Sequence, residues 1–448
     1  MRALAGALTL LPGAAFACAL PPSVILTLPT GHYIAGAAAT VAVTAAMGAM
    51  ARSLPQLQAV PVLTRRVWVP VSVSSYLSFL CFLGLVLVGL FGARDPMHNL
   101  MTLVFWTGIW IAVPLGSMLL GNLWRPINPW TAPVRITRTL LGRTGSVGLS
   151  RLGHWPAVAG YAGFTWFQLV SMAPDDPTVL AWVALTYWLV IFALAVAEGE
   201  EWLAQGEFLT VLMGYLAKVA PFWLDLDDGR ATLMRGWPGA QVMRMPGLSF
   251  SAMGFITLAL SALTFDGLME TFWWHSVIGE NPLEPTGRSA VMGVNTIGLL
   301  AVWGLTSLAL WGVIRLGKAL SGARFATGPV MLSFLAIAAG YHAAHYLVVL
   351  LTAGQYTLAA LNDPLFRGDA LLGLPPFYVS FGFLTDRTVM PIMYAVQFAA
   401  ILGAHLLAVL LTLRLAGPTR AVAHLPMTAL MVGYTVLGLW LLSTARTG

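Results

Sequence analysis

The sequence predicts an all-α fold, a polytopic integral membrane bundle of about ten transmembrane helices. Of its 448 residues, 58% are hydrophobic and only 9% are charged, whereas soluble domains carry about 25% charged residues. Apolar stretches of roughly 20 residues recur along the chain, and this is the length that an α-helix needs to cross a bilayer. Strand-like alternation of polar and apolar residues is absent, so helices are the only spanning element that the sequence favours.

Ten stretches are almost without charged residues, and we expect each of them to span the membrane. They cover residues 30–51, 68–92, 99–121, 155–173, 178–197, 249–274, 290–313, 329–352, 389–413 and 425–444. No fixed-period repeat or low-complexity linker divides the chain. Residues 20–448 are therefore expected to form a single integral membrane domain.

The first 20 residues, MRALAGALTLLPGAAFACAL, are typical of a signal peptide over residues 1–19. Arg2 precedes a short apolar core, and the small residues Ala15 and Ala17 lie near a cleavage point. An uncleaved first helix is the alternative. The two cysteines, Cys18 and Cys81, give no disulfide framework.

The distribution of Lys and Arg predicts the orientation of the chain in a bacterial inner membrane. When the mature N-terminus is placed on the periplasmic side, most basic residues fall in inner loops, as the positive-inside rule expects. The C-terminus is then periplasmic as well. Few basic residues remain outside, namely Arg94, Arg288, Arg367, Arg387 and Arg446. The net charge of +6 thus reflects membrane topology, and it gives no reason to expect nucleic acid as a partner.

Three long loops stand out between the predicted spans. The inner loops 122–154 and 198–248 mix apolar and charged residues at roughly helical spacing, so we expect amphipathic segments that lie along the inner interface. The outer loop 353–388 has an apolar middle that suggests a lid over the bundle. A surface loop without a function is the alternative.

Polar side chains inside the spans gather at one level. Helix rise places them about 8 to 15 Å below the outer face, on five different helices. Polar groups at such depth face the bundle interior or a wet cavity, and they usually mark a functional site. They are Gln168, Asp266, Asn295, His342, His345 and Gln397.

Asp266, His342 and His345 form the set with the clearest chemistry. Two imidazoles and a carboxylate suit Zn²⁺ or a similar divalent ion, which lowers the pKa of bound water and promotes hydrolysis. These three residues are the predicted metal ligands and catalytic residues. Residues that would orient them are Tyr341, Gln397, Asn295 and Gln168.

Two other interpretations of the histidines stay open. Both rings could hydrogen-bond to neighbouring helices, or they could belong to a proton or substrate pathway. No haem is expected, because the His pair lies on one helix, and no nucleotide is expected, because the chain has no phosphate-cradling Gly loop.

Several passages resemble a family of bacterial polytopic membrane proteins labelled fenitrothion hydrolase. They extend from residue 28 to the C-terminus and include LPTGHYIAGAAATVAV, RDPMHNL, GNLWRPINPW, TFDGL, YHAAHYLVVLLTAGQY, NDPLFRGDALLG and HLPMTALMVGYTVLGLWLLSTA. The resemblance implies an inner-membrane protein with an outward-facing site that hydrolyses an apolar phosphotriester. It assigns no catalytic residues.

Three functions are therefore compatible with the sequence. The first is a membrane-embedded, metal-dependent hydrolase of an apolar ester or phosphotriester that enters from the lipid or the periplasm. The second is a transporter or metal-handling permease that uses the same polar residues. The third is a non-catalytic subunit whose inner loops dock a protein partner through the acidic residues Glu198, Glu200, Glu201 and Glu207.

Overall fold

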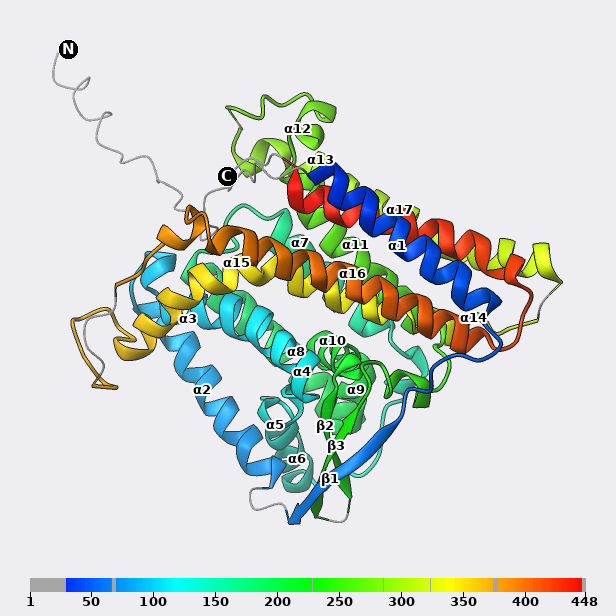
Figure 1. Cartoon of the computed structure of the whole chain (residues 1–448). Coiled ribbons are helices and arrows are strands. Elements are labelled where there is room, and N and C mark those ends of the chain that lie inside the picture. Colours follow the sequence, from blue (N-terminus) through cyan, green and yellow to red (C-terminus); the bar gives the residue numbers. More distant parts are fainter. Residues whose placement is uncertain are drawn as a thin grey trace.

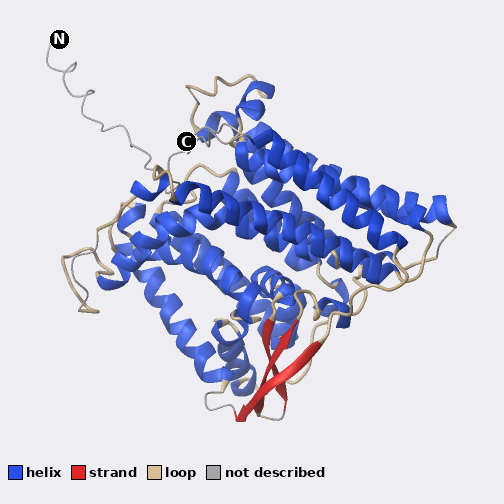
Figure 2. Ribbon diagram, viewed as in Figure 1, coloured by secondary structure: helices blue, strands red, loops and turns tan. Residues whose placement is uncertain are grey.

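The computed structural model describes residues 30–66, 70–227, 229–284, 286–322, 324–373 and 378–444. Helices dominate this part of the chain, and the strands form one small sheet (Figure 2). The predicted signal peptide, residues 1–19, lies outside the described residues.

Nine helices among the described residues are long and apolar enough to cross a membrane. This confirms the predicted all-α polytopic class. The spans are α1 (Thr30–Met50), α2 (Val71–Phe91), a composite of α3 (Leu100–Leu103), the π-helix η2 (Val104–Ala112) and α4 (Val113–Leu120), α8 (Pro177–Glu198), α11 (Phe250–Met269), α13 (Arg288–Ser321), α14 (Thr327–Met331) with α15 (Phe334–Asn362), α16 (Val389–Ala416), and η8 (Ala421–His424) with α17 (Leu425–Ser443).

The remaining predicted span, 155–173, corresponds to a shorter helix, α7 (Trp155–Leu169). Its 15 residues give a length of about 22 Å, less than a typical hydrocarbon core of about 30 Å. The Trp155 ring packs edge-on against Phe250 at the start of α11. At the other end of α7, Gln168 hydrogen-bonds to Tyr346, which contacts the last part of α11. The short helix therefore runs parallel to α11 along most of that span.

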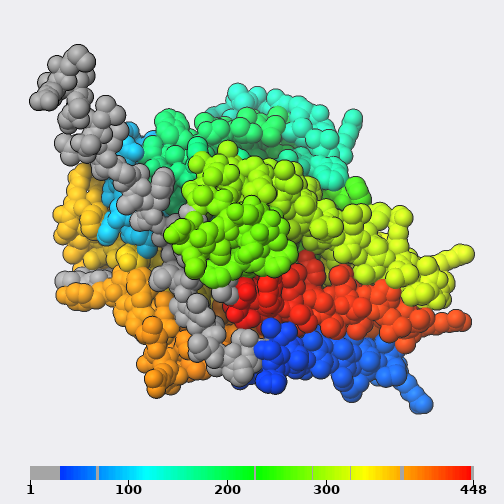
Figure 3. All heavy atoms as spheres, turned by 90° about the horizontal axis from the view of Figure 1, so that it is seen from above, coloured from blue at the N-terminus to red at the C-terminus, as the bar shows by residue number. Residues whose placement is uncertain are grey.

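The two described ends of the chain lie at the same end of the bundle. α1 and α17 pack side by side and run in opposite directions, so α1 begins where α17 finishes (Figure 1). Seen from above, they form neighbouring bands on one face (Figure 3). When both ends lie on the same side of the bundle, the number of crossings must be even. The nine long spans together with α7 give such a number.

The helices α11 and α15 form the centre of the bundle. In the apolar 18-residue stretch of α11, 78% of the residues are buried inside the protein, whereas 11% are buried in the corresponding stretch of α2. Helix α15 packs closely on α16 at Gly340. A Cβ added at this position would lie only 2.2 Å from the Cβ of Ala404. Polar side chains on α11 and α15 consequently face other helices of the protein and not lipid.

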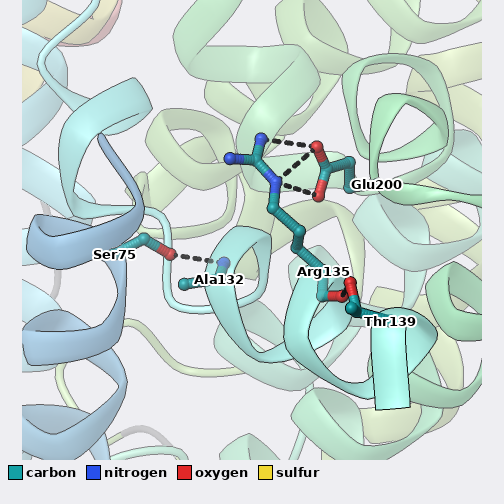
Figure 4. A network of polar contacts seen from close by, with 5 residues as sticks. All are labelled: Ser75, Ala132, Arg135, Thr139 and Glu200. Carbon is teal, nitrogen blue, oxygen red and sulfur yellow. Dashed lines mark hydrogen bonds and ion pairs between the residues drawn. The ribbon is translucent and has the colours of Figure 1, made fainter. Parts of the chain in front are cut away.

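The loop 122–154 contains α5 (Trp124–Ile127), α6 (Thr131–Leu140) and the 3-10 helix η3 (Leu149–Leu152). Helix α6 buries Val134 and exposes Arg135, whose Nε lies 2.9 Å from both carboxylate oxygens of Glu200 (Figure 4). The hydroxyl of Ser75 on α2 accepts a hydrogen bond from Ala132 N. The loop is thus fixed to both α2 and the segment after α8.

The loop 198–248 differs from the helical segment that the sequence suggested. It contains η4 (Glu200–Trp202), α9 (Leu203–Gly206), α10 (Phe208–Leu216), η5 (Ala217–Val219) and η6 (Val242–Arg244), but also the strands β2 (Phe222–Asp227) and β3 (Arg230–Gly236). These strands pair antiparallel, and β1 (Ala59–Arg66) adds to β3 in the order β1-β3-β2. Gly229, with φ of 73°, provides the turn conformation that the tight hairpin needs.

The outer loop is shorter than predicted, because α15 continues to Asn362. The segment after Asn362 folds back on the bundle. The amide of Gln355 exchanges hydrogen bonds with the backbone of Ser380, and the Phe366 ring lies 4.0 Å from that of His98, centroid to centroid. The described residues of this segment contain η7 (Gly382–Leu384), and neighbouring outer segments contain η1 (Pro96–His98) and α12 (Phe272–Val277).

Candidate functional site

A buried polar cluster joins three helices near the centre of the bundle. Asp266 lies one turn before the end of α11, His345 and Tyr346 lie in the middle of α15, and Gln168 lies near the end of α7. The start of α11 is fixed by Ser249, whose hydroxyl accepts a hydrogen bond from Ala252 N. From this cap the helix places Asp266 beside α15.

Asp266 Oδ2 is the centre of the hydrogen-bond network. His345 Nε2 lies 3.1 Å from this oxygen, and the Tyr346 hydroxyl donates to it over 2.7 Å. Gln168 Nε2 in turn donates to the Tyr346 hydroxyl over 3.1 Å. Because a carboxylate in a protein interior is costly without donors, these contacts explain how Asp266 is tolerated there.

The two ring nitrogens of His345 have different surroundings. Nε2 faces an acceptor oxygen, so it carries the proton when the ring is neutral. Nδ1 is buried and has no hydrogen-bond partner among the described residues. The side chains of His345 and Asp266 are 7% and 11% exposed. The result is an imidazole that is oriented by a carboxylate and has a free lone pair on its opposite side.

The hydrogen bond of His342 goes outside this cluster, although its ring packs edge-on against that of Tyr346, with centroids 4.7 Å apart. Its Nε2 lies 3.1 Å from the backbone carbonyl of Trp110, in the π-helix η2. Trp110 lies four residues before Pro114, and proline has no N–H to donate to the carbonyl four residues earlier. His342 therefore supplies a donor to a carbonyl that has lost its regular α-helical partner, and its part in the predicted ligand set stays a prediction.

The residues expected to orient the ligands lie in different parts of the bundle and contact different groups. The Tyr341 ring stacks on His345, with centroids 5.9 Å apart, and a Cβ at Gly267 would come within 2.9 Å of its hydroxyl. Gln168 belongs to the cluster. Gln397 Nε2 instead donates to Ala344 O over 2.8 Å, and Asn295 Oδ1 accepts from Trp274 Nε1 over 2.9 Å. Gln397 and Asn295 are thus used in helix packing.

A zinc-like ion does not fit this arrangement of donors. Asp266 and His345 meet, whereas Nε2 of His342 is directed to the Trp110 carbonyl. Within the described ranges, no group of three His, Cys, Asp or Glu side chains is placed to hold a metal ion. The divalent metal therefore stays a prediction that these donors do not support.

Sequence reasoning missed two members of the site. Tyr346 directly follows His345, and its hydroxyl lies closer to Asp266 Oδ2 than the imidazole does. Its adjacency to the His pair was the available signal. Trp110 contributes its backbone carbonyl to His342, and its ring packs edge-on against that of Tyr346, with centroids 6.1 Å apart. The sequence does not reveal the carbonyl contact, although Pro114 in the middle of a span was a hint of it.

Comparison with protein-family models, with characterised proteins and with solved structures finds no match to this chain. The fold and the cluster define the class, a multi-pass membrane protein with a buried carboxylate–imidazole pair. Any narrower function depends on the chemistry of the cluster itself.

Proposed function

We propose that this protein is a membrane-embedded hydrolase of an apolar ester or phosphotriester, in which His345 is the general base. One observation carries the proposal: His345 is held by Asp266 through Nε2, while its Nδ1 has no partner among the described residues. A base of this kind needs a free nitrogen and a second group that fixes the ring.

The proposed step uses water as the nucleophile. Nδ1 of His345 takes a proton from water while the water oxygen attacks the ester carbon or the phosphorus. The bond to the leaving group then breaks, and His345 returns the proton to the leaving oxygen. Asp266 stabilises the imidazolium that forms in between, and Tyr346 with Gln168 holds the carboxylate in place.

The substrate class follows from the surroundings of the pair. Apolar spans enclose it, so an uncharged, lipid-soluble ester would reach it more readily than a charged one. The resemblance to the fenitrothion hydrolase family points to the same class. We place the site towards the periplasmic side of the inner membrane, as the distribution of basic residues favours.

Hydrolysis by purified protein in lipid nanodiscs tests the proposal. The substrates are a nitrophenyl dialkyl phosphate and a nitrophenyl ester of a short fatty acid, and the variants are His345→Gln and Asp266→Asn. The matched control is His405→Gln, because His405 is also buried in a span but bonds to Ile401 O of its own helix. We expect kcat to fall about 100-fold in the two site variants and to change little in the control.

Hydrolysis by His345→Gln at the wild-type rate would contradict the assignment of His345 as the general base. Turnover lost equally in all three variants would mean that the change reflects folding. The midpoint of thermal unfolding of each variant, measured in the same nanodiscs, separates these outcomes.

A proton-coupled transporter is the second candidate, and the π-helix η2 favours it. This segment interrupts a span beside the cluster, and irregular helices inside membranes often accompany functional sites. Uptake into proteoliposomes that depends on a pH gradient, and loses this dependence in His345→Gln without any ester turnover, would select the transporter.

A further inference from the structure

A second candidate site lies between the ends of spans, whereas the polar cluster lies near the centre of the bundle. A cavity of about 310 Å³ opens where α13 ends, α14 begins, α16 ends and η8 begins. Its lining residues are Ser321, Arg324, Phe325, Ala416, Pro418, Thr419 and Arg420.

The cavity lies at the membrane surface. Ser321 and Ala416 are the last residues of their spans, and the other lining residues occupy the short connections to the next spans. Leu316 and Leu320 on α13 and Leu425 on α17 are exposed nearby in the chain, at 50%, 53% and 60%. These side chains are suited to contact acyl chains next to the cavity.

The cavity is positively charged. Arg324 and Arg420 are exposed and have no ion-pair partner in the part of the chain that the structure describes. No lining residue is acidic, and residues 288–362 and 387–448 contain no Asp or Glu at all. Lys318 bonds to the neutral Thr327 hydroxyl and lies over the Phe325 ring, so its charge is not cancelled either.

We propose that this cavity binds a phosphate-bearing anion through Arg324 and Arg420. Guanidinium groups pair well with phosphate oxygens, and basic pockets between spans are suited to lipid headgroups. The phosphate belongs either to an anionic phospholipid or to a soluble phosphate. The proposal is independent of the hydrolase function, because no residue of the cavity belongs to the polar cluster.

Native mass spectrometry and thermal unfolding of the detergent-purified full chain test this site. The probes are phosphatidylglycerol, phosphatidylcholine and inorganic phosphate, each added alone. The double variant Arg324→Ala/Arg420→Ala is compared with Arg66→Ala/Arg230→Ala, which removes two exposed arginines from the sheet instead. We expect anion binding about 25-fold weaker in the cavity variant, on the order of fivefold per arginine, and unchanged in the control.

The probes identify the source of the phosphate. Binding of phosphatidylglycerol without binding of inorganic phosphate indicates a lipid headgroup. Binding of inorganic phosphate alone, lost in the cavity variant, indicates a soluble ligand. Equal binding by wild type and by the cavity variant, or equal loss in both double variants, would overturn the proposal.

Discussion

At the scale of single residues, the two histidines of α15 show how one helical turn separates two roles. His345 faces α11 and meets a carboxylate, whereas His342 faces η2 and meets a backbone carbonyl. Three residues along a helix correspond to a rotation of about 60°, which is enough to direct the rings to different neighbours. Both contacts satisfy groups that would otherwise be costly in the bundle interior.

Removing His342 should weaken the fold and leave the chemistry intact. In His342→Ala the Trp110 carbonyl loses its donor, and we expect the free energy of unfolding to fall by about 1–3 kcal/mol. Denaturant unfolding in mixed micelles measures this loss. The shape of the pH–rate profile should not change, and a changed profile would place His342 in the reacting centre after all.

At the scale of elements, hydropathy predicted the spans well because the bilayer imposes their length. The start of α2 at Val71 and the end of α16 at Ala416 lie within three residues of the predicted limits. The sheet was missed because β1 pairs with a strand that lies more than 160 residues later, and such pairing leaves no local pattern. The extension of α15 to Asn362 was missed because its last turns leave the apolar window.

A double-mutant cycle tests the link between η2 and α15. Pro114→Ala restores an N–H that can donate to the Trp110 carbonyl, so the loss caused by His342→Ala should be smaller in the Pro114→Ala background. Unfolding of the four proteins in the same detergent gives the coupling energy. Strictly additive effects would show that Pro114 and His342 act independently.

The inner element α10 contains a buried carboxylate whose titration should affect stability. Glu207, at the N-terminal cap of this helix, accepts hydrogen bonds from the Tyr187 hydroxyl, from Leu209 N, and from the backbone and hydroxyl of Thr210. Burial nonetheless raises the pKa of Glu207 above its ordinary value of 4.5. The folded protein therefore binds this proton more tightly than the unfolded chain does.

The sign of the effect follows from this difference in proton binding. The contribution of Glu207 is fully present below the ordinary carboxyl pKa and is lost as the pH rises through the raised value. We expect the unfolding midpoint of wild type to decrease over this range, and Glu207→Gln to flatten that dependence. Glu201→Gln, at an exposed carboxyl, is the control and should keep the wild-type slope.

At the scale of the whole molecule, the helix count and the positions of the ends agree on topology. The described chain starts and finishes at one end of the bundle, and the nine long spans together with the short helix α7 give the even number of crossings that this requires (Figure 1). The sequence predicted the level at which polar residues gather, and Asp266, His345 and Gln168 do meet. It could not predict which way each side chain points: Gln397 and Asn295 hydrogen-bond to Ala344 and Trp274, whereas His342 bonds to the Trp110 carbonyl while its ring contacts Tyr346.

Reporter fusions test the predicted orientation. Alkaline phosphatase fused after Ser443 should be active, because the positive-inside rule places this end in the periplasm. The same enzyme inserted within 142–147 should be inactive, because this loop carries basic residues of the inner side. The reverse pattern of activities would invert the molecule and place the polar cluster towards the cytoplasm.

The proposed chemistry depends above all on Asp266 holding His345 in one tautomer with a free Nδ1. Solid-state nitrogen NMR of histidine-labelled protein in lipid measures this directly, with the His345 signal assigned by its absence in His345→Gln. We predict a ring protonated at Nε2, with a nitrogen shift that changes in Asp266→Asn. A ring protonated at Nδ1, or a nitrogen shift that is the same in wild type and in Asp266→Asn, would contradict this arrangement.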